Sequence, residues 1–164
     1  MSSEGPNVTS EEFRRACGRS ANGVSIATAL DADGMPHGLT VSSFTSVSLD
    51  PPLVLICLGH GVTVIDIFRD APSFGINVLA EGQQELSERF ARKGEDRFDG
   101  LEWYSGSTGV PLLPGVLAAI ECAVEQRIPA GDHDIFVARM VAAQVAEGEP
   151  LIHFRGCYRR LALD

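Results

Sequence analysis

The sequence predicts a mainly antiparallel β-barrel with short helices that close its ends or flank it. Segments rich in β-branched and aromatic residues follow one another at hairpin spacing, without the strand–helix alternation of a parallel sheet. Only three short windows have helical periodicity. We expect about seven strands in one domain over residues 9–164, preceded by a flexible polar N-terminus over 1–8.

The first elements form a helix and a hairpin. Thr9 and Glu12 make a capping-box pattern, which predicts a helix over about Ser10–Ser20. A strand over Val24–Leu30 follows. The Asp31–Gly34 turn returns the chain, as a four-residue hairpin loop, into a hydroxyl-rich strand.

The Asp50-Pro51-Pro52 sequence predicts a corner, because neither proline can donate to a strand ladder. After this corner we expect further strands and helices, and an irregular segment, polar and glycine-rich, over Lys93–Pro114 separates the three long C-terminal strands from the rest. Those elements are a buried strand over Leu53–Leu58, a helix from its N-cap Thr63 to about Arg69, a strand over Ser73–Leu79, a helix over Gln83–Arg92, and three long strands over Leu117–Ile128, His133–Val145 and Leu151–Leu161.

Composition limits the functional classes. The formal charge of −9 and the absence of a basic run argue against nucleic-acid binding. No apolar stretch is long enough to span a bilayer and no export signal is visible, so we expect a cytoplasmic protein without membrane contact. The four cysteines are widely spaced, which predicts reduced, mostly buried thiols. The histidines lack ligand spacing, so no metal site is expected.

Hydroxyl side chains crowd the strand that follows Gly38, from Thr40 to Ser48. Two interpretations stay open from spacing alone: a face in contact with water, or the wall of a site for a polar ligand. Ser42 and Ser43 point to opposite faces if the strand is regular, so at most one of them would reach a ligand.

Three other side chains have both a structural and a functional interpretation. His133 follows a Gly-Asp turn and is the one titratable ring at the mouth of a strand. Arg89 ends a predicted helix, where it would either complement the helix dipole or hold a phosphate. Cys57 lies in a buried strand, where a cysteine is more often an inert apolar residue than a nucleophile.

Several segments, in order along nearly the whole chain, resemble the flavin reductase family, the NAD(P)H:flavin oxidoreductase components of two-component monooxygenases. The segments that carry the resemblance are Phe13-Arg14-Arg15-Ala16-Cys17-Gly18, Asn22-Gly23-Val24, the run from Gly38 to Pro52, Phe74-Gly75-Ile76-Asn77-Val78-Leu79-Ala80, Gln83, Leu86-Ser87, Phe90-Ala91, Gly131-Asp132-His133-Asp134 and the run from Pro150 to Tyr158.

The resemblance implies an FMN-binding split β-barrel, antiparallel and Greek-key-like, that forms a homodimer. It implies hydride transfer from NADH or NADPH to FMN or FAD, after which reduced flavin diffuses to a partner monooxygenase. No arginine cluster that would bind the 2′-phosphate of NADPH is evident in the sequence, which slightly favours NADH over NADPH.

The resemblance also implies roles for particular residues. His133 would lie on the nicotinamide side, with Tyr158 nearby, while Thr63, Arg89 and Phe90 would serve the phosphate end of the flavin. The remaining positions would line the isoalloxazine ring and ribityl chain: Gly38, Leu39, Thr40, Ser42, Ser43, Cys57, Leu58 and Gly59. The segment Gly59-His60-Gly61-Val62-Thr63 departs from the family pattern, because relatives often carry serines or a basic residue there.

Two alternatives remain. A tightly FMN-binding electron carrier or oxidase of the split-barrel group would hold stoichiometric flavin and lack steady NAD(P)H turnover with free flavin. A non-catalytic scaffold subunit would consume no NADH at all.

Overall fold

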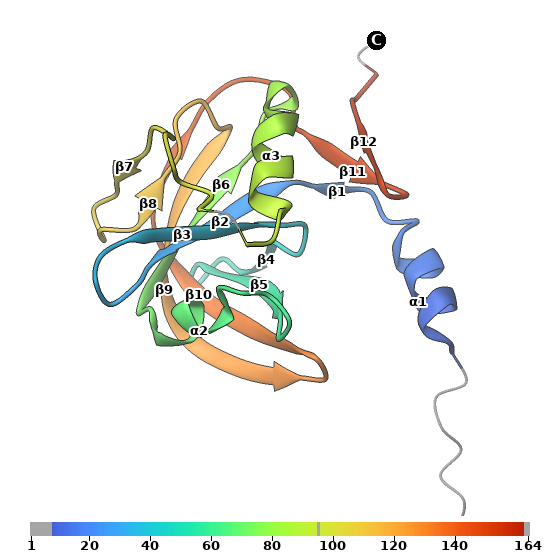
Figure 1. The fold of residues 1–164 in the computed structure, drawn as a ribbon, viewed down its shortest axis with the longest axis horizontal. Helices are drawn as coiled ribbons and strands as arrows, with labels where there is room; N and C mark the ends of the chain where they lie inside the picture. The colour runs from blue at the N-terminus through green and yellow to red at the C-terminus, as the bar shows by residue number, and fades with distance from the viewer. Residues whose placement is uncertain (1–7, 95, 163–164) are drawn as a thin grey trace, which may run out of the picture.

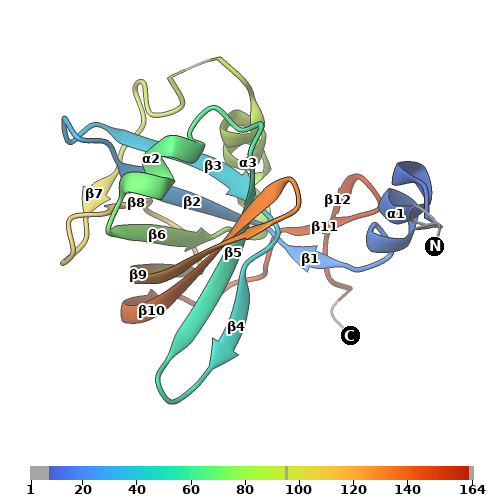
Figure 2. The ribbon, with the colours of Figure 1, turned by 90° about the horizontal axis from the view of Figure 1, so that it is seen from below.

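The computed structural model describes residues 8–94 and 96–162, so the expected flexible N-terminus lies, except for Val8, outside the described residues. Its main element is a seven-stranded antiparallel sheet with the order β3-β2-β6-β9-β10-β5-β4. The sheet curls into a partly closed barrel (Figures 1 and 2). Its strands are β2 (Ser25–Leu30), β3 (Pro36–Val41), β4 (Thr45–Ser48), β5 (Leu53–Gly59), β6 (Ser73–Val78), β9 (Ala118–Ala130) and β10 (His133–Val145).

The smaller elements flank this barrel. A three-stranded sheet joins β1 (Asn22–Gly23), β11 (Ile152–Phe154) and β12 (Cys157–Arg159), and a two-stranded sheet joins β7 (Tyr104–Ser105) and β8 (Pro111–Leu112). The helices are α1 (Ser10–Cys17), α2 (Ile65–Asp70) and α3 (Gln84–Ala91), and a short 3₁₀ helix over Glu81–Gln83 precedes α3. Both ribbon views show α1, β11 and β12 to one side of the barrel (Figures 1 and 2).

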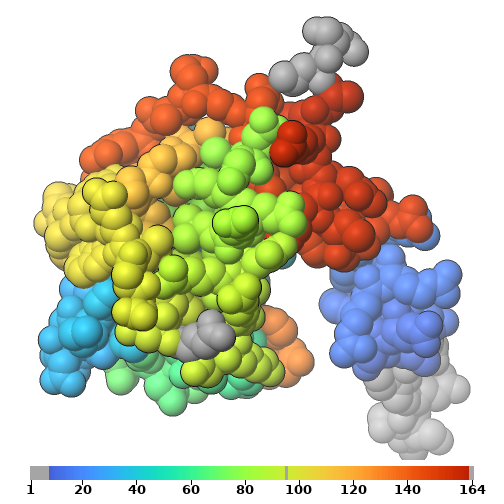
Figure 3. Space-filling model, turned by 45° about the horizontal axis from the view of Figure 1, so that its top comes forward, coloured from blue at the N-terminus to red at the C-terminus, as the bar shows by residue number. Residues whose placement is uncertain are grey.

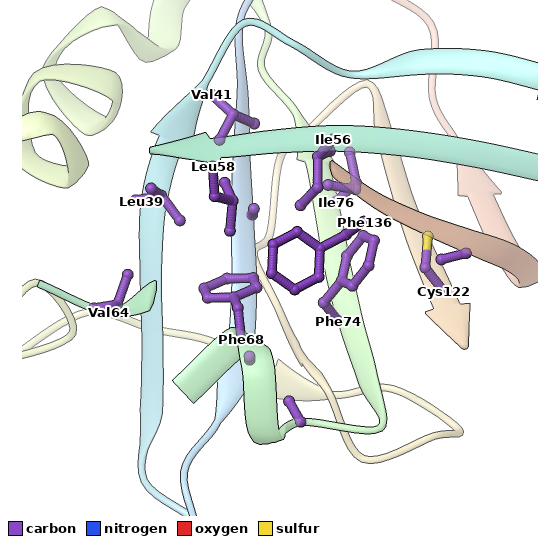
Figure 4. Packing of buried hydrophobic residues seen from close by; sticks show 14 of the residues in the cluster. Leu39, Val41, Ile56, Leu58, Val64, Phe68, Phe74, Ile76, Cys122 and Phe136 are labelled. Carbon is purple, nitrogen blue, oxygen red and sulfur yellow. The ribbon is translucent and has the colours of Figure 1, made fainter. Parts of the chain in front are cut away.

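The barrel is filled by aromatic and branched side chains. Phe68 of α2 packs at the centre, with ring centroids 6.4 Å from those of Phe74 and Phe136 (Figure 4). A second cluster lies under α3, where Phe90 meets Phe98 edge-on at 5.1 Å. Helix α2 therefore closes one part of the barrel, and α3 covers another.

Several sequence predictions are confirmed. Thr9 and Glu12 form the full capping box of α1. The β2–β3 hairpin turns at Asp31–Gly34, where Gly34 has a φ of +77°. The long antiparallel pair predicted from the C-terminal third is β9–β10, joined through Gly131 at a φ of +63°.

Three predictions are wrong. The hydroxyl-rich segment is two strands, because the chain leaves the ladder after Val41 and resumes it at Thr45. Thr63 does not cap α2: the N-cap position is Val64, which makes no side-chain capping bond. The expected long strand over Leu151–Leu161 is the β11–β12 hairpin, because Arg155 and Gly156 both take positive φ values and reverse the chain.

The cysteine prediction is partly wrong as well. All four thiols are free, but Cys17 and Cys157 are exposed. Cys122 is buried, which raises the pKa of its thiol to about 12, and burial also raises the pKa of Cys57. Among the described residues, no helix is long and apolar enough to cross a membrane.

Candidate functional site

The end of β5 and the start of β10 bring His133 over Gly59. The two residues are register partners, and a Cβ atom built at Gly59 would lie 3.5 Å from Nε2 of His133. Nδ1 of His133 lies 2.7 Å from Oδ1 of Asp132, and this hydrogen bond holds the pKa of Asp132 below its usual value. About half of the His133 side chain is exposed. The imidazole is therefore accessible from solvent and lies next to backbone that carries no side chain.

A second histidine–aspartate pair lies beside the first. Asp134 accepts from Nε of Arg69 at 2.8 Å, and its other carboxylate oxygen lies 2.9 Å from Nε2 of His60. The Arg69 bond, followed by the His60 bond, lowers the pKa of Asp134. The backbone N–H of His60 also donates to the carbonyl of Asp132 at 2.9 Å. These bonds fix the loop after β5 against the start of β10.

The hydroxyl-rich segment joins β3 to β5. Oγ of Ser43 accepts from the backbone N–H of Cys57 at 2.9 Å and donates to the carbonyl of the same residue at 3.1 Å. Ser42 beside it is exposed. The neighbouring serines thus differ: Ser43 replaces a missing ladder bond, while the hydroxyl of Ser42 faces the surface.

Helix α3 is tied to two strands through one buried residue. The carbonyl of Ser87 accepts from Oγ1 of Thr40 at 2.6 Å, and Oγ of Ser87 lies 2.8 Å from the hydroxyl of Tyr158. Phe90 of the same helix packs on Gly38, where an added Cβ would lie 2.9 Å from its ring. Close approach of α3 to β3 therefore requires glycine at position 38.

Two arginines hold the loop that follows α3. Arg89 donates from Nε to the carbonyl of Arg97 at 2.7 Å and from Nη2 to the carbonyl of Asp99. Arg97 donates to the carbonyl of Gly38 at 2.6 Å and to that of Arg92. Burial lowers the pKa of Arg97. The guanidinium groups thus pin the loop to β3.

This loop and the β2–β3 hairpin enclose a groove of about 640 Å³. The size falls in the range of small-molecule sites. Its wall combines the aromatic side chains of Phe98 and Trp103, which meet edge-on at 6.2 Å, with polar groups. The polar lining includes His37, Thr63 and Arg97.

The structure divides the expected site residues into groups. Ser42, Thr63 and His133 are exposed, Gly59, Cys57 and Arg89 are half-buried, and Gly38 is buried. The side chains of Leu39, Leu58 and Phe90 are in the core, so any contact of these residues with a ligand would come from their backbone atoms. The hydroxyls of Thr40, Ser43 and Tyr158 are bonded within the protein.

Sequence reasoning missed Arg97 and Trp103. Both lie in the irregular excursion, where no periodicity assigns a side chain to a face. The Asp96-Arg97-Phe98 triplet carries the available signal, namely a cation next to an aromatic residue in a segment too polar for the core.

A family model described as "Flavin reductase like domain" matches residues 17–162. The chain belongs to the flavin reductase-like domain family. Within the family, it is 42% identical to "FMN reductase (NADH) SmoA" of Agrobacterium fabrum, over 93% of this chain and 87% of that protein. It is 41% identical to the "4-nitrophenol 4-monooxygenase/4-nitrocatechol 2-monooxygenase, reductase component" of Rhodococcus opacus, over 88% and 77%.

The lengths of the family members differ. This flavin reductase-like chain spans about half the length of the "Probable flavin reductase" of Rhizobium meliloti (strain 1021), to which it is 44% identical over 92% of its own residues.

A solved structure has the same architecture as this flavin reductase-like chain. The NADH:FAD oxidoreductase SgcE6 of Streptomyces globisporus C-1027, in complex with NAD and FAD fragments, superposes with a TM-score of 0.89 at 35% identity, over 98% of this chain and 99% of that one. The expected fold is confirmed: a mainly β split barrel, antiparallel, with few short helices.

Proposed function

We propose that this chain reduces FMN or FAD with NADH or NADPH and releases the reduced flavin to a partner monooxygenase. The observation that carries the proposal lies at the end of the β5–β10 ladder, where an exposed imidazole stands over a residue without a side chain. Membership of the flavin reductase-like family supports the same reaction class.

The site suits planar rings. Gly59 leaves its floor free, and the Ser42–Ser43 segment beside Cys57 presents backbone and a small hydroxyl. In this proposal, Gly38 to Ser43 and Cys57 to Gly59 contact the isoalloxazine and ribityl groups. Thr63 and Arg89 would serve the phosphate end, and Arg89 would use Nη1 because its other nitrogens bind loop carbonyls.

Flavin supplies the redox chemistry, accepting hydride at N5 from C4 of the nicotinamide. The protein's contribution is to hold the two rings in contact, at about 3 to 3.5 Å, which supplies much of the rate acceleration. His133 would orient the nicotinamide carboxamide, and Asp132 would fix the orientation of its ring through Nδ1. Backbone N–H groups of the Thr40–Ser43 stretch would stabilise charge on the reduced flavin.

A flavin that serves as a substrate must leave the protein. The proposed contacts are single hydroxyls and backbone groups, which fits micromolar affinity, on the order of 8 kcal/mol. We expect the purified protein to be colourless or faintly yellow.

We propose that the active form is a homodimer. Large apolar side chains are exposed on β4 and β10 and just beyond β4, at Val47, Leu49, Val141 and Val145, with 49%, 92%, 47% and 82% exposure. Large apolar side chains exposed in this number are typical of a protein that forms an interface. The exposed free thiols of Cys17 and Cys157 fit a reducing compartment, and we place the protein in the cytoplasm.

The deciding experiment follows NADH or NADPH absorbance with FMN, FAD and riboflavin supplied separately. The proposal requires multiple turnovers with free flavin, and analytical ultracentrifugation should give twice the chain mass. Stoichiometric bound flavin without turnover would favour the electron carrier or oxidase. Neither flavin binding nor NADH consumption would favour the scaffold subunit.

A further inference from the structure

Four arginines line a hollow of about 480 Å³ where α1 meets the β11–β12 turn. Figure 3 shows this part of the molecule at one side of the body, with α1 below the C-terminal hairpin. None of its residues lines the groove between the β2–β3 hairpin and the loop that follows α3. The lining residues are Arg14, Arg15, Arg19, Arg155, Gly18, Gly156 and one acidic residue, Glu11.

The two walls of this arginine hollow are fastened to each other. Gly18 ends α1, and its carbonyl accepts from the backbone N–H of Arg155 at 3.2 Å. Four residues further on, β1 pairs with β11 through Asn22 and His153. Chain segments far apart in sequence thus bring their arginines together by backbone bonds, independently of the guanidinium groups.

The guanidinium groups have no acceptors of their own. Within residues 8–94 and 96–162, the side chains of Arg14, Arg15, Arg19 and Arg155 form no hydrogen bond or ion pair, and all four residues are exposed. The hollow carries a net charge of +3, with Glu11 included, in a chain whose total is −9. The rest of the chain therefore carries −12, and cations gather at this one place against the overall field.

The backbone conformation of Arg155 is energetically unfavourable for a residue with a side chain. Its φ of +54° makes it the only described non-glycine residue with a positive φ. Tight hairpins strongly prefer asparagine, aspartate or glycine at such a position, because a Cβ is crowded there. Complementation of the α1 dipole accounts for arginines in the last helical turn, but not for an arginine in the turn of another hairpin.

We propose that the arginine hollow binds an anion of the pyrophosphate class, either free or as part of a nucleotide. Planar guanidinium forks match phosphate oxygens two at a time, and several converging forks suit an anion with several charges. The volume suits a small ligand rather than a flat macromolecular surface. Glu11 opposes the anion and limits its affinity.

The test is isothermal titration calorimetry of the full chain with inorganic pyrophosphate and, separately, ADP, at about 0.15 M salt, where surface charge is well screened. We expect millimolar or tighter binding of at least one of them, and sulfate at matched ionic strength should bind at least about tenfold more weakly. Tighter pyrophosphate binding would identify a free anion, and tighter ADP binding a nucleotide.

Arg15→Gln and Arg155→Gln should each weaken binding by about tenfold, since each removes a charged fork. Arg15→Lys, which keeps the charge, should give an intermediate loss. Glu11→Gln should tighten binding at least about twofold. Arg159→Gln, in β12 but outside the hollow, is the control and should change nothing; thermal unfolding without ligand should be the same for all variants.

The proposal is overturned if neither anion binds better than sulfate, or if both arginine-to-glutamine variants bind as tightly as the parent. Binding of an acidic peptide without either phosphate ligand would also overturn it, in favour of a protein-docking surface.

Discussion

His133 stands opposite Gly59 across the β5–β10 ladder, with Nε2 3.5 Å from the point that a Cβ at position 59 would occupy. The relationship places an exposed imidazole directly above backbone that carries no side chain. It makes His133 the residue whose removal most sharply tests the proposed reaction.

His133→Ala should raise the KM for NADH at least about fivefold and lower kcat, because the nicotinamide loses an orienting contact. Steady-state kinetics with saturating flavin measure both constants. His153→Ala, a ring in β11 packed on Tyr158, serves as the control. Both constants within about twofold of the parent would rule out the orienting role.

Ser43→Ala should destabilise the fold by about 1 to 2 kcal/mol, because the N–H of Cys57 loses its acceptor in a half-buried position. The flavin dissociation constant should rise as well, since the wall beside Cys57 loosens. Urea unfolding and flavin fluorescence provide the two readings. Ser46→Ala on the exposed face of β4 should change neither quantity.

Glu121→Gln should lower the free energy of unfolding by about 2 to 3 kcal/mol, because the carboxylate accepts hydrogen bonds from the backbone N–H groups and hydroxyls of Ser107 and Thr108. Burial raises the pKa of Glu121, but these hydrogen bonds outweigh it, and the folded-state pKa lies below the usual value.

The same residue predicts a pH dependence. Since the folded-state pKa is depressed, the stabilisation is complete above the unfolded value of about 4.3 and is lost as pH falls through the folded-state pKa. As the pH falls from neutral to about 3, urea unfolding should therefore show a shrinking difference in the free energy of unfolding between the parent and Glu121→Gln. A constant difference across that range would contradict the assignment.

Gly38→Ala should lower the free energy of unfolding by about 1 to 3 kcal/mol, because the added methyl group overpacks the contact between β3 and α3. The new Cβ would lie 2.8 Å from the carbonyl oxygen of Ala27 and 2.9 Å from the Phe90 ring, and backbone cannot yield as a flexible side chain does. Gly61→Ala is the matched control, since its Cβ would meet nothing within 4 Å. Equal unfolding midpoints for the two variants would refute the packing argument.

Local signals predicted much of the fold. The capping box at Thr9 and the Asp31–Gly34 turn are chemical patterns that act over a few residues, and both form as expected. The prediction of one long C-terminal strand was wrong because Arg155-Gly156 lacks the usual Asn-Gly signature of a tight hairpin. Arg155 has a positive φ and donates its backbone N–H to the carbonyl of Gly18, a contact between distant segments that no local pattern reveals.

The candidate site was less predictable than the fold. The sequence indicated that hydroxyls gather from Thr40 to Ser48, but it could not show that Ser43 is bonded to Cys57 while Ser42 is exposed. That difference arises because the strand breaks after Val41. Arg97 was missed because its acceptor, the carbonyl of Gly38, lies 59 residues away in the chain.

The hydrogen bonds that hold the loop after α3 do not depend on a carboxylate, so this loop should keep its shape in acid. Arg89 and Arg97 both donate to peptide carbonyls, which have no titration in the range where carboxylates gain protons. The pKa of Asp134 lies below its usual value, so acidity beyond the usual carboxylate range is needed to weaken its contacts at one side of the barrel mouth, and the wall built on α3 is spared. The two halves of the mouth should lose their shape at different acidities, the histidine side first.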